Sequence, residues 1–156
     1  MKTLRWFKFF LWYFGLFKVA LIGYLRPRLI KIDDKEMVVC LPLNRRSRNH
    51  LGSMYFGALA VGADLAGGMH GFYHAEQQQC RISLVFKSFS AQFLKRPEAD
   101  VYFVSEDGEK VRAMIEESRK QSTRVNKPIK VRAFTDYPSR SEPVAEFSLE
   151  LSIKVS

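Results

Sequence analysis

The sequence predicts an α+β domain in which an antiparallel sheet wraps around one helix rich in small residues. Residues 145–155 alternate between apolar and polar side chains, which is typical of a half-buried antiparallel strand. Residues 53–69 carry eight glycines and alanines in a helical segment. No internal repeat or low-complexity linker divides the chain, so we expect a single domain over residues 27–156, preceded by a helix over residues 1–26.

Composition and charge limit the classes of protein. A chain of 156 residues, 47% hydrophobic and 13% aromatic, can bury a core and is not disordered. Cys40 and Cys80 have no partner cysteines or ligand-like spacing, so we expect reduced thiols, no metal and a cytoplasmic protein. The net charge of +9 suits nucleic acid, an acidic membrane surface or a phosphate-bearing cofactor. The aromatic residues are not interleaved as in a base-stacking surface, so no nucleic-acid partner is expected.

The first 26 residues predict an amphipathic helix. At 100° per residue, the basic side chains share one arc and a wide apolar face occupies the other. That apolar face comprises Phe7, Phe9, Phe10, Tyr13, Phe14, Phe17, Leu21, Tyr24 and Leu25. Lys8 and Lys18 interrupt the apolar run, so neither a membrane span nor a signal peptide is expected. We expect the helix to pack on its own domain or on a partner subunit, with peripheral contact at a membrane interface as the alternative.

The main domain begins after Pro27, which lacks the backbone donor that would continue the first helix. Residues 29–32 and 37–41 predict two short strands. Residues 80–95 predict a long strand whose apolar side chains change parity near Lys87, which indicates a β-bulge. The remaining elements are a strand at 99–103, a helix at 109–121 and strands beginning at 129 and 145.

The small-residue helix is predicted to lie against the sheet. Each interior glycine costs about 1 kcal/mol of helix propensity, so close tertiary packing must stabilise the helix. Ala58, Gly62 and Ala66, four residues apart, form a stripe that another backbone can approach. Asp64 is the one acidic residue between Glu36 and Glu76, and a carboxylate in such a helix must be partnered or functional.

A motif spans residues 49–64 at the start of this helix. Asn49, Gly52, Gly57 and Asp64 occupy its positions 0, 3, 8 and 15. This pattern resembles the signature of hotdog-fold thioesterases, and most of all their PaaI-like branch and its uncharacterised relatives. The order of the predicted helices and strands also suits that family over most of residues 29–156.

The resemblance implies an acyl-CoA thioesterase with a hotdog fold, an antiparallel sheet around a central helix. It implies that Asp64 is the general base or nucleophile and that Asn49 positions the site. The backbone amides around Phe56 and Gly57, at the positive end of the helix dipole, would polarise the thioester carbonyl. The family's site forms between two subunits, so a homodimer or tetramer is expected, with acyl-CoA as substrate and no other cofactor.

One part of the motif differs from the family pattern. The usual His-Gly pair is replaced by Tyr55 and Phe56, which leaves a non-catalytic protein that binds acyl groups or lipids as the alternative function. Arginine binds the phosphates of coenzyme A well, because its planar donors match an anionic oxygen pair. The predicted substrate-binding residues are Gly52, Tyr55, Phe56, Arg45, Arg46 and Arg48.

Overall fold

One six-stranded antiparallel sheet and four helices make up the computed structural model, which describes residues 2–156, with only the backbone described at Lys2. The helices are α1 (Lys2–Phe17), α2 (Ala20–Leu25), α3 (Phe56–Gln77) and α4 (Gly108–Gln121). The strands are β1 (Arg28–Ile32), β2 (Met37–Leu41), β3 (Ile82–Phe93), β4 (Val101–Ser105), β5 (Val125–Phe134) and β6 (Ala145–Val155). Their order across the sheet is β1-β2-β4-β5-β6-β3, so β1 and β3 form the two edges.

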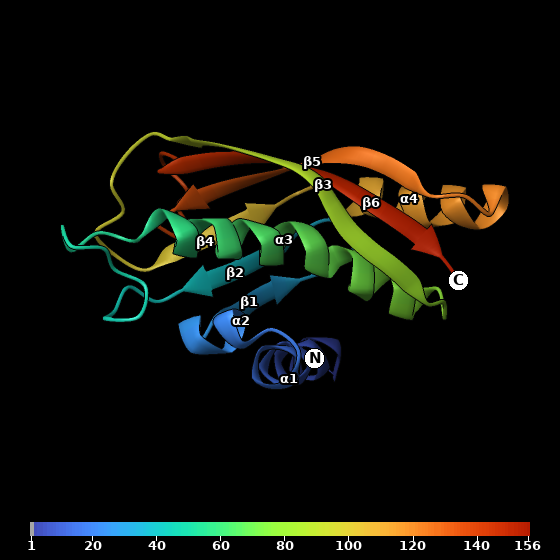
Figure 1. Cartoon of the computed structure of the whole chain (residues 1–156), viewed down its shortest axis with the longest axis horizontal. Helices are drawn as coiled ribbons and strands as arrows, with labels where there is room; N and C mark the ends of the chain where they lie inside the picture. Colours follow the sequence, from blue (N-terminus) through green and yellow to red (C-terminus); the bar gives the residue numbers. More distant parts are fainter. Residues whose placement is uncertain (1) are drawn as a thin grey trace.

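The sheet curves around α3, as the sequence predicts. In Figure 1, β5 and β6 pass above α3, whereas β1 lies below it, between α3 and the helices α1 and α2. Helix α3 contacts β2, β3, β4, β5 and β6. The main core therefore lies between one face of α3 and the inner face of the sheet.

The alternation in β6 decides which face of the sheet is buried. Ala145, Phe147, Leu149, Leu151 and Ile153 are all buried, and Glu146 is exposed on the other face. In β3, the pairing with β6 shifts between Phe86 and Ser88, so the predicted bulge at Lys87 is present. A bulge bends a strand and increases its twist, which helps the sheet to wrap around the helix.

Helix α3 begins three residues later and ends eight residues later than predicted. Residues 54 and 55 are extended and Ser53 lies in a bend, because Met54 forms a β-bridge with Arg48 and the N–H of Tyr55 donates to the carbonyl of Ser47 at 2.7 Å. At the other end, the helix continues through His70 and His74, whose side chains are buried. The sheet covers this last part of the helix, and tertiary packing outweighs the low helix propensity of its glycines.

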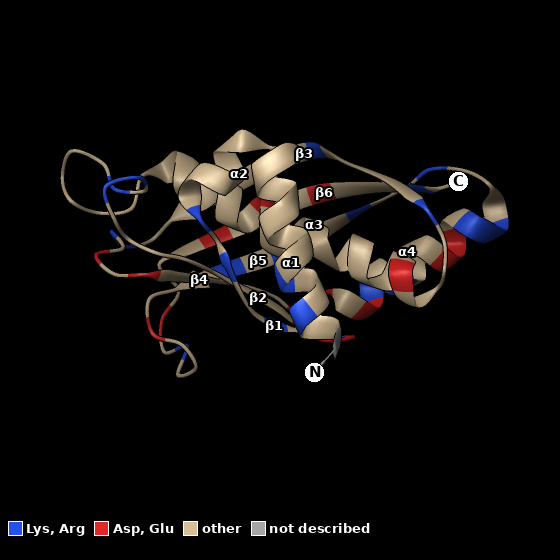
Figure 2. Ribbon diagram, turned by 90° about the horizontal axis from the view of Figure 1, so that it is seen from below, with Lys and Arg blue, Asp and Glu red and all other residues tan. Residues whose placement is uncertain are grey.

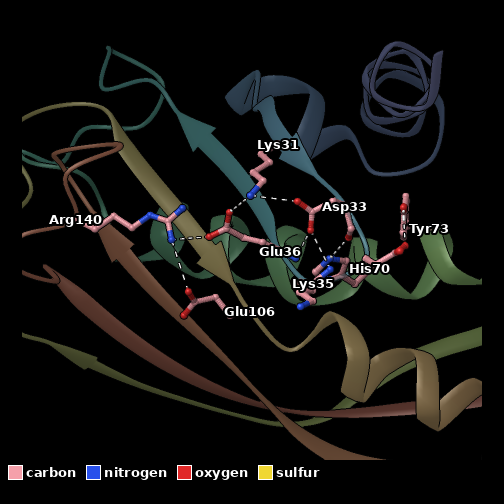
Figure 3. Close-up of polar contacts among 9 residues, drawn as sticks. Lys31, Asp33, Lys35, Glu36, His70, Tyr73, Glu106 and Arg140 are labelled. Atoms are coloured by element: carbon pink, nitrogen blue, oxygen red, sulfur yellow. Dashed lines mark hydrogen bonds and ion pairs between the residues drawn. The ribbon is translucent and has the colours of Figure 1, made fainter. Parts of the chain in front are cut away.

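The turn between β1 and β2 holds the C-terminal half of α3 in place (Figure 3). Nε2 of His70 donates to the carbonyl of Asp33 at 3.1 Å, and the hydroxyl of Tyr73 donates to Asp34 at 2.9 Å. Beside this turn, Glu36 forms ion pairs with Lys31 at 2.6 Å and Arg140 at 2.5 Å. The turn is therefore anchored to α3 and to the chain beyond β5.

The N-terminal segment forms two helices rather than the single predicted helix. The chain turns at Lys18 and Val19, and α2 folds back on α1 so that their backbones touch at Gly15 and Gly23. A Cβ atom placed on Gly15 would lie 2.8 Å from the backbone nitrogen of Gly23. This reversal buries Ile22 in the core.

The buried face of the N-terminal segment differs in part from the predicted apolar face. Phe7 and Leu25 of that face are buried, and Phe10 and Phe14 are half-buried against α3. The other predicted members point to solvent: Phe9, Tyr13, Phe17, Leu21 and Tyr24. The prediction failed for these residues because it treated α1 and α2 as one straight helix and because α1 is apolar around most of its circumference.

Candidate functional site

The loop before α3 is organised by Asn49. Its side-chain oxygen accepts hydrogen bonds from the N–H of Leu51 at 2.9 Å and of Ser53 at 3.2 Å, and its amide donates to the Ser53 hydroxyl at 3.1 Å. Gly52 has a φ of +83°, a conformation that side chains other than glycine rarely adopt. Asn49 and Gly52 of the motif therefore fix the shape of the turn that leads into the helix.

The first turn of α3 presents backbone donors. In the described chain, no acceptor contacts the N–H groups of Phe56, Gly57 or Ala58, and no side chain caps the helix at Tyr55. These N–H groups carry the positive end of the helix dipole. The ring of Tyr55 lies over Gly57, because a Cβ placed on Gly57 would be 2.5 Å from that ring. The start of α3 can bind an oxyanion, with Tyr55 beside it.

A groove of about 510 Å³ lies between this loop and the end of β3. Of the predicted site residues, it brings together Asn49, Tyr55 and Phe56. The other lining residues are His50, Ser53, Met54, Leu59, Phe93, Leu94, Lys95, Arg96 and Pro97. The ring of Phe56 lies 6.4 Å from that of Phe93, so the groove has an apolar wall. Lys95 and Arg96 lie at its end, where they pair with Glu142 and Glu98.

Asp64 lies on α3, outside the lining of this groove. It is half-buried, and it has no ion-pair or hydrogen-bond partner within residues 2–156. Burial raises the pKa of Asp64 above its ordinary value. Gly68 lies one turn further along the same face of α3. A Cβ atom placed on Gly68 would be 3.3 Å from the ring of Phe86. Asp64 therefore faces the side of α3 that is covered by the edge strand β3.

The three predicted arginines lie around a different part of the loop. Arg45 and Arg46 line a groove with Tyr24 and Arg26 at the end of α2, and the guanidinium of Arg46 lies 5.6 Å from the centre of the Tyr24 ring. Arg48 pairs with Met54 through the backbone bridge. The structure thus places Arg45 and Arg46 toward the N-terminal helices, and the cations that line the groove of Tyr55 are Lys95 and Arg96.

His70 and His74 lie four residues apart on α3, a spacing at which two histidines can share one metal ion. Their rings stack with centres 5.7 Å apart, and both are buried. Within the described residues, no third His, Cys, Asp or Glu joins them to form a group that could hold a metal ion. Burial, together with the proximity of His74, lowers the pKa of His70 to about 4. His70 is therefore neutral at pH 7 and packs α3 against the β1–β2 turn.

The sheet that curves around α3 is shared with several solved structures. A protein of unknown function from Chlorobaculum tepidum has a TM-score of 0.84 at 11% identity, covering 100% of both chains. The chain is also similar to a thioesterase family protein from Silicibacter pomeroyi, with a TM-score of 0.66 at 16% identity over 99% of this chain and 98% of that one. The protein has the hotdog fold.

A third hotdog structure is a thioesterase from Haemophilus influenzae, with a TM-score of 0.63 at 13% identity over 90% of this chain and 87% of that chain. No protein-family model and no curated protein matches the sequence. The full coverage of the Chlorobaculum structure includes the segment of α1 and α2. Both N-terminal helices therefore belong to the architecture that this hotdog protein shares with its structural relative.

Proposed function

We propose that this hotdog protein hydrolyses acyl thioesters of coenzyme A, with Asp64 as the general base or nucleophile. The observation that carries the proposal is a half-buried carboxylate without a partner in the described chain, on the helix whose first turn offers unpaired amides. Burying a carboxylate without a partner destabilises a folded protein, so such groups occur mainly where they serve a function. The solved relatives named as thioesterases support the same reaction class.

The amides at the start of α3 supply the electrophilic part of the reaction. When water or a carboxylate attacks a thioester carbonyl, negative charge develops on the carbonyl oxygen. The N–H groups of Phe56 and Gly57 point out of the helix end and would stabilise that charge, as an oxyanion hole does. The thiol of coenzyme A then leaves, and the acyl group is released as a carboxylic acid.

Asp64 supplies the basic or nucleophilic part of the reaction. Burial raises its pKa, which makes its carboxylate a stronger base than an exposed aspartate. As general base it would accept a proton from the attacking water. As nucleophile it would attack the carbonyl itself, and water would then hydrolyse the anhydride formed.

The distance between these two parts requires a second subunit. Gly57 and Asp64 are seven residues apart on one helix, a separation of about 10 Å along its axis. One thioester carbonyl group therefore cannot contact both the amide of Gly57 and the carboxylate of Asp64 in the same chain. We therefore propose a composite site in which the α3 amides of one subunit act with Asp64 of another.

Strand β3 is the edge at which a second copy would pair. It is 12 residues long and unpaired on one side, whereas helix α1 packs beside the opposite edge strand β1. Val85, Phe89 and Phe93 on β3 are 49%, 44% and 53% exposed. A long, apolar, open edge favours pairing with another chain. A dimer formed there would add a second α3 on the side of the first helix that carries Asp64.

The groove beside Tyr55 would receive the substrate. Its apolar wall of Phe56 and Phe93 suits an acyl or aryl group, and Lys95 and Arg96 at its end suit the phosphates of coenzyme A. Arg45, Arg46 and Arg48 are on the same loop and are further candidates for phosphate contact.

The test is hydrolysis of a panel of acyl-CoA substrates, from short to long chains and including aryl groups. Asp64→Asn should lower kcat/KM at least about 1000-fold, because the base or nucleophile is lost. Glu116→Gln, which neutralises an exposed carboxylate on α4, is the matched control and should retain wild-type rates. Unchanged turnover by Asp64→Asn, or no turnover of any substrate by the wild type, would refute the proposal.

Mixing two inactive variants tests the composite site. Gly57→Pro removes one amide donor near the helix start, where the helix needs no backbone N–H at this position, although the Tyr55 ring must rotate away to admit the proline ring. After unfolding and refolding together, Asp64→Asn and Gly57→Pro chains should recover about one quarter of the wild-type activity. Half of the dimers are then mixed, and each mixed dimer has one intact site. No recovery from well-folded mixed dimers would show that both groups act within one chain.

A second candidate function has its own supporting observation. The ring of Tyr55 covers Gly57, and Phe56 is 59% exposed at the first position of α3, so bulky side chains crowd the amides. This arrangement favours a protein that binds acyl groups without hydrolysing them. Saturable binding of acyl-CoA, with the thioester still intact after prolonged incubation, would support this function over hydrolysis.

A further inference from the structure

We propose that α1 and α2 form a docking surface for an anionic lipid bilayer. This inference is independent of the proposed hydrolysis and depends on the exposed face of the two N-terminal helices. The outer helical face, as we name it, consists of Trp6, Phe9, Trp12, Tyr13, Leu16, Phe17, Leu21 and Tyr24. Four observations support the proposal: the apolar character of this face, its charge, the adjoining groove and the orientation of the helices.

The outer helical face is apolar and continuous along α1. Phe17 is 63% exposed, and its ring lies 5.1 Å from Tyr13 and 6.5 Å from Trp12. Trp12 in turn lies 5.7 Å from Phe9. Monomeric soluble proteins rarely expose a large contiguous apolar patch, and such patches mark sites of interaction. Tryptophan and tyrosine are the side chains that favour the boundary between lipid and water.

The charge of the N-terminal segment favours an anionic partner. The first acidic residue of the chain is Asp33, and the seven Lys and Arg before it are Lys2, Arg5, Lys8, Lys18, Arg26, Arg28 and Lys31. The first 32 residues therefore hold seven of the nine net positive charges. Figure 2 shows Lys and Arg on α1, and neither α1 nor α2 contains an acidic residue.

Most of these cations lack compensation from the protein. Arg28 pairs with Asp100, and Lys31 pairs with Asp33 and Glu36. By contrast, Arg5, Lys8, Lys18 and Arg26 have no acidic partner within the described residues. Arg45 and Arg46 extend this positive region next to Arg26 and Tyr24. Unpaired cations beside exposed rings match a surface of anionic head groups over hydrocarbon.

A groove of about 1020 Å³ between α1, α2 and β1 has the same amphipathic character. Leu11, Ile22 and Leu29 form its buried apolar part, and Lys8 and Arg26 lie among its lining residues. Cations at its rim would contact lipid phosphate, while Trp12 and Leu16 beside them would enter the acyl region.

The arrangement suits a helix that lies along the bilayer surface. Both helices are on one side of the molecule and face the viewer in Figure 2. Of the helices in residues 2–156, none combines the length and the apolar character that crossing a bilayer requires. A second copy of this chain is a poorer partner for the face, because a two-fold contact would bring the unpaired cations of both copies together.

The two tryptophans provide a direct test with the full chain, since Trp6 and Trp12 are both on the exposed side of α1. Vesicles of phosphatidylcholine with about 30% phosphatidylserine should shift the tryptophan emission to shorter wavelength and carry the protein in a flotation assay. Vesicles of phosphatidylcholine alone should do neither, and about 0.5 M salt should release the bound protein.

Charge reversal tests which face binds. Lys8→Glu with Lys18→Glu should weaken binding to the anionic vesicles about 30-fold or more. The control variant, Lys120→Glu with Lys154→Glu, changes the total charge by the same amount at residues on α4 and β6. It should weaken vesicle binding less than about threefold. Both variants alter exposed side chains, and circular dichroism checks that they fold.

Three outcomes would overturn the proposal. The first is that the protein does not bind anionic vesicles, and the second is that both double variants lose binding equally. The third is that the tryptophan emission shifts to shorter wavelength on raising the protein concentration without lipid, in step with dimerisation through α1. That last result would assign the outer helical face to a second copy.

Discussion

Helices α1 and α3 are both apolar, yet the protein surrounds them differently. In α3, 14 of 22 residues are buried, and most of them are glycine, alanine or other residues that the sheet approaches closely. In α1, Phe7 and Leu11 are buried while six large apolar side chains are more than about 40% exposed. The comparison shows that apolar character alone does not predict burial, whereas small residues do predict a close neighbour.

The largest expected effect is a difference in stability between alanine substitutions on the buried and on the exposed side of α1. Phe7→Ala should lower the free energy of unfolding by about 4 kcal/mol, because the ring is 1% exposed and packs 5.7 Å from Tyr73. Phe9→Ala removes a ring that is 60% exposed and should cost less than about 0.5 kcal/mol. Urea denaturation measures both. Equal losses would show that another chain covers the outer helical face in solution.

A smaller effect tests how completely α3 is enclosed. Burial, with His74 as a second cause, lowers the pKa of His70 to about 4, below the value of about 6.5 in an unfolded chain. As the pH falls, the unfolded chain binds this proton first. The stability that depends on neutral His70 is therefore complete above pH 6.5, and about 3 kcal/mol is lost between pH 6.5 and 4.

His70→Gln should remove that part of the pH dependence, as measured by denaturation between pH 4 and 7. The exposed His50 provides the control, because His50→Gln should leave the pH dependence unchanged. A pH profile of His70→Gln identical to that of the wild type would mean that His70 binds its proton equally well in the folded and the unfolded chain.

The smallest effect measures how near the sheet lies to α3. A Cβ on Gly62 would overlap the ring of Phe103, so Gly62→Ala should cost about 2 kcal/mol. A Cβ on Gly67 would meet Val131 at 3.6 Å, an ordinary contact, so Gly67→Ala should stabilise the protein by up to about 1 kcal/mol through helix propensity. Thermal denaturation compares the two, and shifts of the same sign would contradict the described packing.

Most of the fold could be predicted from the sequence because its patterns are local. The alternation from Ala145 to Val155 and the change of parity at Lys87 both depend on neighbours along one strand. The ends of α3 and the break at Lys18 depend instead on distant parts of the chain. The extended residues 54 and 55 are held by Ser47 and Arg48, and α2 reverses where Gly15 and Gly23 meet. No periodicity in the sequence encodes those contacts.

The candidate site was predictable to a smaller extent. The resemblance to the thioesterase motif grouped Asn49, Gly52 and Gly57 as one unit, and the structure shows that unit as the turn and first residues of α3. The groove also contains Phe93 and Leu94, which the sequence did not indicate because their apolar character equals that of any strand residue. The role of Asp64 stays a prediction, since its partner groups are proposed to come from another subunit.

The contact between Gly15 and Gly23 has a consequence for recognition. Because the two backbones touch, the contact at these glycines sets how α1 and α2 pack and how the aromatic rings of one helix lie relative to those of the other. A methyl group at either glycine would wedge the helices apart and tilt the rings of one relative to the other. Gly15 and Gly23, which have no side chains to contact a flat target, thus determine the shape that the outer helical face presents to it.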